Sequence, residues 1–305
     1  MPLTDSQRIV ELARWAEPVR ASDGQWLEDA RRLVAGAVAR HPAFAGLGLL
    51  VEPVGSWANG THLGSAVDID VRVEFAERTF HGAVGGMSAQ GLARRHRAYG
   101  GRWTPQEFRS ELGAALSSAC DVVDTGRSTA LRVPGVPGGR PGIRVVPCFG
   151  YLHRPVLTGT EQRGIVVFTR DGRHLVNWPR QQLENGRAKD AATGHRYTYA
   201  VRALKAVAAD LTSTGASRSL PSYFTECLIH CVPDGTLRTG SPDDAFRGSL
   251  GFLEYQLSVW SMFAKPDTLL EPNGIRRLFG PGRPWTRSDG HALVTAVRRH
   301  LGYRR

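Results

Sequence analysis

Two short segments near residue 60 place the strongest constraint on what this chain can fold into. The first opens with Gly55-Ser56, and the second contains Asp68 and Asp70. In residues 67–73, apolar side chains alternate with charged ones, and this period of two predicts a strand with one buried face. Both aspartates then lie on the other face, about 7 Å apart along the strand.

The two segments together suggest a particular chemistry. Two carboxylates on one face are costly to keep ionised unless a cation binds between them, and oxygen ligands suit a divalent metal ion. A Gly-Ser turn can bring backbone N–H groups and a hydroxyl up to a phosphate. Each half also has an ordinary explanation, as a simple turn and as a solvated strand face. Their combination predicts phosphoryl or nucleotidyl transfer.

Composition limits the class of protein. The chain has 305 residues, 41% of them hydrophobic and 22% charged, which is enough for a large core and two lobes. No apolar run approaches the roughly 20 residues that span a bilayer, and the segment 1–5 lacks the features of a secretory signal. The four cysteines show no metal-binding spacing. We therefore expect a cytoplasmic protein without a membrane partner.

The net charge of +11 is the next constraint on partners. A positive net charge favours nucleotides or nucleic acid as partners, but a protein with an arginine-rich solvated surface can have the same charge and bind neither. The cluster Arg94-Arg95-His96-Arg97 is either a solvated helix end or a contact with nucleic acid or an acidic partner. Nucleic acid is thus a partner that the sequence supports only weakly.

The pattern of the whole chain predicts an α+β protein. We expect a mixed-sheet lobe over residues 1–168, a helical lobe over residues 169–305 and an active site in the cleft between them. The first lobe is expected to have helices at 23–40 and 104–120, the second of which opens at a capping box of Thr104 and Glu107. Its strands are expected at 47–54, 66–75, 127–133 and 143–149. The second is expected to have helices at 196–212, from Pro221 onward, and after Thr286, where Asp289 completes a capping box.

Further motifs carry a family resemblance. They are Val145-Val146-Pro147-Cys148-Phe149, Lys205, residues 221–227 and Pro284-Trp285-Thr286. With the Gly-Ser and Asp-x-Asp segments, they make the chain resemble the bacterial cGAS/DncV-like nucleotidyltransferases over nearly its whole length. The resemblance implies a polymerase-beta-like nucleotidyltransferase fold. It also implies condensation of nucleoside triphosphates into a cyclic oligonucleotide second messenger for anti-phage signalling, with an effector or regulatory protein as a further partner.

The resemblance also implies roles for single residues. Asp68 and Asp70 would be catalytic and would hold Mg²⁺ or Mn²⁺ ions that bridge the triphosphate. Gly55 and Ser56 would hold the β- and γ-phosphates. Two residues of the helical half, Lys205 and Ser222, would reach the triphosphate, and Glu226 would be a structural partner there. The alternative for Lys205 is a surface lysine on an amphipathic helix, and Ser222 could equally be an ordinary first-turn residue.

One position departs from the family. A third carboxylate is expected on the strand that here begins Arg144-Val145-Val146, and arginine stands in its place. A guanidinium stays protonated, so it neither ligates a metal ion nor acts as a base. In one arrangement, Arg144 binds Asp68 or Asp70 and occupies the space that the metal ions would take. In the other, Arg144 turns aside and catalysis is slower. A third explanation is that the family motif has been aligned one or two residues out of place on this strand.

Arg144 therefore leaves two classes of function open. The first is a Mg²⁺-dependent cyclic oligonucleotide synthase, which the retained pair Asp68 and Asp70 favours. The second is a degenerate member that binds a nucleotide or a protein partner without turnover, as a sensor or scaffold. A nucleic-acid-binding protein that uses residues 94–97 is a third and weaker hypothesis.

Overall fold

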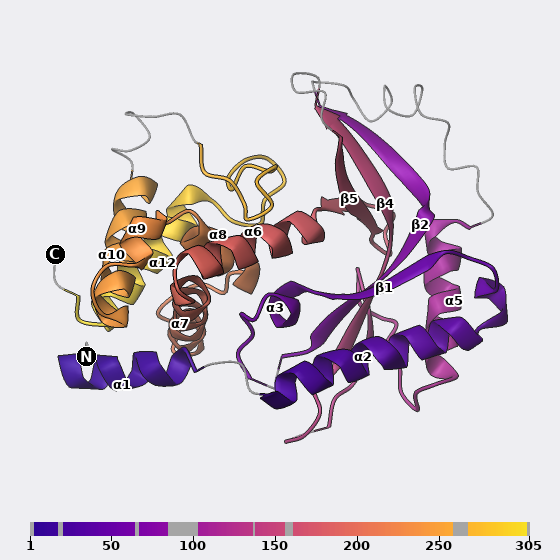
Figure 1. Ribbon diagram of the computed structural model, residues 1–305, viewed down its shortest axis with the longest axis horizontal. Helices are drawn as coiled ribbons and strands as arrows, with labels where there is room; N and C mark the ends of the chain where they lie inside the picture. The colour runs from indigo at the N-terminus through magenta and orange to yellow at the C-terminus, as the bar shows by residue number, and fades with distance from the viewer. Residues whose placement is uncertain are drawn as a thin grey trace. The chain divides into compact units, whose positions relative to one another are not determined.

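A computed structural model describes residues 3–17, 21–64, 67–84, 103–136, 138–155, 161–258 and 268–303 of the chain (Figure 1). It divides into two compact units. One, the sheet unit, is made of residues 20–58 and 64–180; the other, the helical unit, is made of residues 1–19, 59–63 and 181–305. The predicted boundary lies after residue 168, whereas the contacts place it after residue 180 and also assign two earlier segments to the helical unit.

The sheet unit is built on a six-stranded mixed sheet, which confirms the predicted fold class. The strand order is β1-β2-β4-β5-β6, and β3 pairs with the first part of β4. The β2–β4 pair is parallel and the other pairs are antiparallel. The strands are β1 (Leu49–Val54), β2 (Ile69–Val84), β3 (Leu131–Val133), β4 (Ile143–Pro155), β5 (Gln162–Phe168) and β6 (His174–Asn177).

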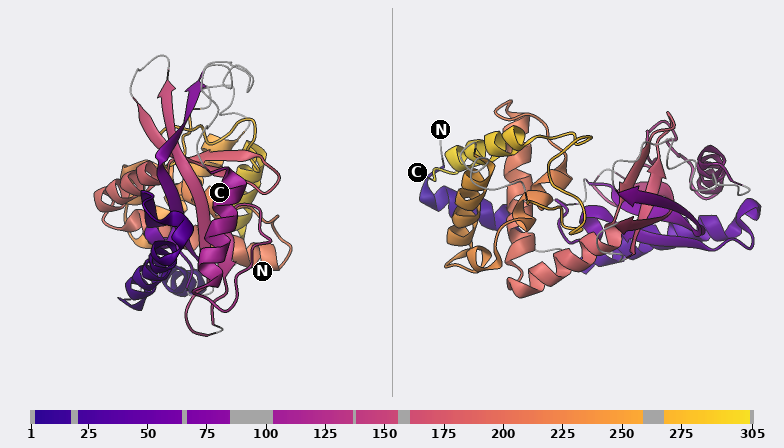
Figure 2. Two further views of the ribbon diagram at one scale, coloured as in Figure 1. Left: turned by 90° about the vertical axis from the view of Figure 1, so that its right-hand side faces the viewer. Right: turned by 90° about the horizontal axis from the view of Figure 1, so that it is seen from above.

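Two helices, α2 (Ala21–Arg40) and α5 (Pro105–Ser117), cover one face of this sheet (Figure 2). Their apolar side chains pack in one core with odd-numbered residues of the first parts of β2 and β4, such as Val71 and Val145. As predicted, α5 begins at a capping box formed by Thr104 and Glu107. Because side chains alternate across a strand, Asp70 in the first part of β2 and its neighbour Arg144 in β4 lie on the face turned away from α2 and α5.

The short helix α3 (Gly55–Ala58) connects β1 to the residues that precede β2. It stands where the sequence analysis expects a Gly-Ser turn. Its Trp57 is buried and packs edge-on against Trp26 of α2. This aromatic contact holds α3 against the sheet unit's core, since large buried rings contribute heavily to packing.

The helical unit has its own apolar core, formed mainly by α7, α8, α10 and α12. Its last helix begins at the predicted capping box of Thr286 and Asp289. The sequence analysis did not predict α1 and α10, although both carry apolar residues at helical spacing. The helices are α1 (Asp5–Trp15), α6 (Pro179–Ala192, which begins in the sheet unit), α7 (Arg196–Ser213), α8 (Ser222–His230), α9 (Asp234–Leu237), α10 (Pro242–Leu257) and α12 (Arg287–His300).

Two predictions about partners concern a membrane and nucleic acid. Among the described residues, no helix is long and apolar enough to cross a bilayer. The basic cluster at 94–97 lies outside the described residues, so its role in binding nucleic acid stays a prediction.

Candidate functional site

The contact between Gly55 and Asp70 is the centre of the candidate site. The antiparallel ladder of β1 and β2 pairs Val54 with Asp70, so the residue that follows β1 must lie beside this carboxylate. Gly55 has φ +72°, and a Cβ atom there would lie 2.7 Å from Asp70 Oδ2. Only glycine fits both conditions without strain. The Gly-Ser segment and the second aspartate are therefore brought together, as predicted.

A second set of contacts positions Asp68. The indole N–H of Trp57 donates to the Val67 carbonyl at 2.9 Å, and the N–H of Ile69 donates to the Gly142 carbonyl at 2.7 Å. These bonds hold the backbone on both sides of Asp68. Gly142 lies so close to Asp68 Oδ1 that a Cβ atom would overlap it. The glycine-rich loop before β4 is thus part of the wall of the site.

Two arginines occupy the same face of the sheet. Arg144 is the register partner of Asp70 in the β2–β4 pair and of Arg132 in the β3–β4 pair. Arg132 binds Asp68 with both ends of its guanidinium, Nε to Oδ2 at 2.6 Å and Nη2 to Oδ1 at 2.9 Å. Arg144 Nε lies 3.1 Å from Asp70 Oδ1. Of the two arrangements considered for Arg144, the structure shows the one in which it pairs with an aspartate.

The two ion pairs differ in quality. The pair of Arg132 with Asp68 has the parallel two-bond geometry that makes guanidinium–carboxylate contacts strong. The pair of Arg144 with Asp70 is looser, because Asp70 Oδ1 is buried and makes no hydrogen bond to any described residue. Burial raises the pKa of Asp70 to about 6; Arg144 opposes this shift and Asp68 adds to it. Asp70 is therefore the less satisfied of the two acids.

These observations test whether the residues suit a divalent cation. Carboxylate oxygens are the donors that Mg²⁺ prefers, and Asp70 Oδ1, which is buried and accepts no hydrogen bond from a described residue, would serve as a ligand once Arg144 moves away. Within the described part of the chain, however, no cluster of three or more acidic, His or Cys side chains forms. Arg132 also holds both oxygens of Asp68. The donor set fits one cation, provided that the guanidiniums give way.

The predicted nucleotide-binding residues of the helical half lie in a different setting. Lys205 is buried in α7, and its ammonium donates to the Thr61 carbonyl and hydroxyl, both at 3.0 Å, and to Glu226 Oε2 at 3.5 Å. Glu226 also accepts bonds from Asn59 at 2.8 Å and from Gln182 at 2.9 Å. Burial lowers the pKa of Lys205, and Glu226 opposes this shift. Lys205 therefore belongs to a buried network of the helical unit.

Two further predicted residues can be placed. Ser56 is the second residue of α3, next to Gly55 in the sheet unit. Ser222 is the exposed first residue of α8 in the helical unit. The binding of a triphosphate by Ser56, Ser222 and Lys205 stays a prediction. Glu226 has the structural role within the helical unit that the sequence analysis assigns to it.

Sequence reasoning missed Arg132 and Gly142. A signal for Arg132 was present, because it alternates with the apolar Leu131 and Val133 and must point to the face that these two avoid. That this face also carries Asp68 follows only from the pairing of β3 with β4. Gly142 had no comparable signal, since its closeness to Asp68 depends on how the loop folds back.

The chain is similar to known nucleotidyltransferases. Residues 184–302 match the model of the cGAS/DncV-like nucleotidyltransferase C-terminal helical domain. A cyclic dipyrimidine nucleotide synthase, CdnE, from Legionella pneumophila is 27% identical over 283 residues, which cover 90% of this chain and 92% of that protein.

Solved structures show that the fold is shared. The structure of the CdnE c-UMP-AMP synthase of Rhodothermus marinus with Apcpp and Upnpp has a TM-score of 0.78 and 24% identity, covering 100% of this chain and 98% of that one. The E. coli MS115-1 CdnC:HORMA-deltaN complex has a TM-score of 0.56 and 19% identity, covering 94% of this chain and 87% of that one.

Proposed function

Because this chain belongs to the cGAS/DncV-like nucleotidyltransferases, we propose that it condenses two nucleoside triphosphates into a cyclic dinucleotide. The family and the enzyme class, a nucleotidyltransferase, are those predicted from the sequence, and the relatives confirm both. The reaction itself is supported by the relatives that are named as cyclic dinucleotide synthases. In each of its two steps, a hydroxyl oxygen of one nucleotide attacks the α-phosphorus of another, and pyrophosphate leaves.

One observation carries the proposal: the contact of Gly55 with Asp70 at the start of β2, two residues after Asp68. The backbone N–H groups at the start of α3 and the Ser56 hydroxyl would hold phosphate oxygens, since the first N–H groups of a helix have no partner within it. Asp70, with its unbonded Oδ1, would face the charge of the cation that accompanies the triphosphate. The pair thus orients the phosphates for attack.

We propose Mg²⁺ or Mn²⁺ as the cofactor, held by Asp70 and, once Arg132 is displaced, by Asp68. When bound, such an ion would neutralise phosphate charge and polarise the P–O bond. Lys205 and Ser222 of the helical unit would reach the triphosphate, a role that rests on the family resemblance alone.

Arg144 limits the chemistry in a definable way. It stays protonated, so it does not accept the proton of the attacking hydroxyl. Its guanidinium can instead donate hydrogen bonds to a phosphate oxygen. The phosphate would then compete with Asp70 for the Arg144 guanidinium. We therefore expect slow turnover compared with a protein that has a carboxylate at this position.

The paired charges favour a second candidate function. Two arginines and two aspartates neutralise each other on this face, with Arg132 bound to Asp68 through two hydrogen bonds. A protein with this arrangement could bind a nucleotide through its phosphates and not turn it over. It would then act as a nucleotide or partner sensor, the alternative that the sequence analysis leaves open.

Product analysis separates the two candidates. The wild type would be incubated with all four labelled nucleoside triphosphates and Mg²⁺ or Mn²⁺, and phosphatase-resistant products would be resolved by chromatography. A resistant product that disappears in both Asp68→Ala and Asp70→Ala establishes the synthase, and its mass gives the ring. Nucleotide binding by calorimetry without any resistant product establishes the sensor.

The biological setting is proposed from the family alone. We propose a role in anti-phage signalling in the cytoplasm, with an effector that responds to the product. A regulatory protein partner is supported by the related complex of a CdnC protein with a HORMA protein. Loss of phage resistance in cells that carry Asp70→Ala in place of the wild type would test this role.

A further inference from the structure

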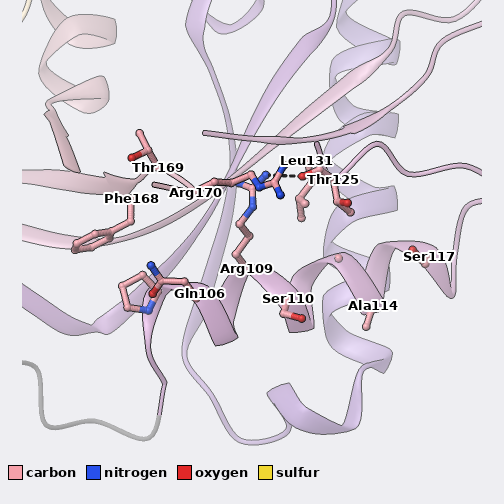
Figure 3. A pocket seen from close by; sticks show the side chains of 12 residues that line it. Gln106, Arg109, Ser110, Ala114, Ser117, Thr125, Leu131, Phe168, Thr169 and Arg170 are labelled. Atoms are coloured by element: carbon pink, nitrogen blue, oxygen red, sulfur yellow. Dashed lines mark hydrogen bonds between the residues drawn. The ribbon is translucent and has the colours of Figure 1, made fainter. Parts of the chain in front are cut away.

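A pocket lies in the sheet unit, on the α5 side of the sheet and therefore on the face opposite Asp70. Its volume is about 500 Å³, within the range of small-molecule sites. One wall is a face of α5 and the other is formed by the chain around Thr125 and by the end of β5 (Figure 3). Gly113 and Ala114 leave space in the middle of the helix face because they carry little or no side chain.

Two arginines give this pocket its charge. Arg109 Nη2 donates to the carbonyls of Thr125, Arg127 and Ala130 at 3.1, 2.6 and 2.9 Å. Arg170 Nη1 donates to a fourth carbonyl of the same loop, that of Gly126, at 2.9 Å. Both guanidiniums are therefore held in place by backbone oxygens, and neither forms an ion pair with a carboxylate of the described residues.

The charge of this pair is unbalanced. Arg109 Nη1 is buried and has no hydrogen-bond partner among the described residues. Burial lowers the pKa of Arg109, and Arg170 lowers it further, because two like charges lie close together. No acidic side chain lines the pocket within the described chain. Asp124 acts on Arg109 from outside the pocket and is itself bound to Arg127 and to the N–H of Gly126.

The remaining lining residues indicate the shape of a ligand. Gln106 and Ser110, in the first turns of α5, offer polar groups on the same side as Arg109. Leu131 and Phe168 offer apolar surface on the opposite wall. A ligand that fits has an anionic group at one end and an apolar or aromatic body at the other.

We propose that this pocket binds a phosphate monoester with an apolar or aromatic body, such as a nucleoside monophosphate, at a site separate from Asp68 and Asp70. A phosphate monoester carries about −1.5 to −2 charges near neutral pH, which matches two guanidiniums better than a single carboxylate does. Guanidiniums also bind phosphate oxygens through two parallel hydrogen bonds. The ligand would supply the partner that Arg109 Nη1 lacks.

Calorimetry on the full chain tests the proposal, with EDTA present to suppress metal-dependent binding elsewhere. The probes are AMP, ribose 5-phosphate, inorganic phosphate and adenosine. We expect AMP to bind with a Kd of about 1 mM or tighter, ribose 5-phosphate and inorganic phosphate to bind more weakly, and adenosine not to bind. If ribose 5-phosphate binds as tightly as AMP, the ligand is a sugar phosphate, and the phosphate site still stands.

Four variants locate the binding. Arg170→Gln removes one charge and Ala114→Phe fills the space; both positions are exposed, so both variants should fold. We expect each to weaken AMP binding at least about tenfold, which is about 1.4 kcal/mol. Arg32→Gln and Ala188→Phe, at exposed helix positions outside the pocket, are the matched controls and should bind as the wild type does. Arg109 is left intact because it organises the loop at 125–130.

A variant at the proposed nucleotide site tests whether AMP binds there instead. Ser56→Ala should leave AMP binding unchanged in EDTA. If Ser56→Ala abolishes binding and Arg170→Gln does not, AMP binds at the proposed nucleotide site and the second site is refuted. Equal losses in Arg170→Gln and Arg32→Gln would also refute it, because they would show an effect of overall charge.

Discussion

Replacement of Arg144 by aspartate is the most direct test of how the candidate site works. Arg144 Nε lies 3.1 Å from Asp70 Oδ1, and the Arg144 side chain is 44% exposed. At such an exposed position, two unit charges about 4 Å apart interact by about 1 to 4 kcal/mol, and screening by solvent favours the lower value. Removal of the positive charge in Arg144→Gln should then strengthen divalent-cation binding at Asp70 at least about tenfold.

Arg144→Asp changes the charge by two units and adds a carboxylate ligand. Affinity should therefore rise at least about a hundredfold, twice the effect of Arg144→Gln in free energy. The assay is a titration with Mn²⁺, in which the free ion is measured by electron paramagnetic resonance without nucleotide. Any synthesis of a phosphatase-resistant product should increase in the same order, with Arg144→Asp above Arg144→Gln and Arg144→Gln above the wild type.

Two results would refute this reasoning. The first is an Arg144→Asp protein that is folded by circular dichroism and binds Mn²⁺ as weakly as the wild type. That outcome would mean that Arg132, bound to Asp68, closes the site by itself, or that Arg144 does not stand at the position of the third acid. The second is an equal gain in Arg32→Asp, an exposed position on α2, which would show that only the net charge matters.

Three further predictions concern the surrounding structure. Gly55→Ala should lower the free energy of unfolding by about 1–3 kcal/mol in chemical denaturation, because it combines a positive φ with a contact on Asp70. Lys205→Met should lower it by about 3–5 kcal/mol, because it leaves the buried Glu226 carboxylate without its cation. Burial is the main cause that lowers the pKa of His230 to about 4. Between pH 4 and 6.5 the unfolded state therefore binds more protons than the folded state, so the free energy of unfolding should fall by about 2 kcal/mol between pH 7 and pH 5. The variant His230→Gln should lose this pH dependence.

Matched variants make these predictions decisive. Gly46 has a positive φ of +74° and no atom within 4 Å of an added Cβ, so Gly46→Ala measures the backbone strain alone; an equal loss in both glycine variants would contradict the contact with Asp70. Lys205→Met combined with Glu226→Gln should recover part of the loss, and a loss at least as large as in Lys205→Met alone would contradict the ion pair. His174→Gln, at an exposed histidine, should keep the wild-type pH dependence.

Local sequence patterns determined much of this protein. The alternation around Asp68 and Asp70 specified a strand and its buried face, because side chains on a strand point alternately to its two sides. The capping boxes at Thr104 and Thr286 specified where two helices begin, since they satisfy N–H groups within four residues of the chain. A functional role was predicted for Gly55-Ser56 because the combination of this segment with the two acids is rarer than either part alone.

Only the tertiary structure decided the electrostatic state of the site. Arg132 is more than sixty residues from Asp68 in the sequence, and its two hydrogen bonds follow from the pairing of β3 with β4. The sequence identified Arg144 as a departure, and the register of β2 with β4 placed it beside Asp70. Strand pairing across long intervals of chain has no local signature, because it depends on which edges meet when the whole sheet forms. The acids could thus be read from the sequence, and their partners could not.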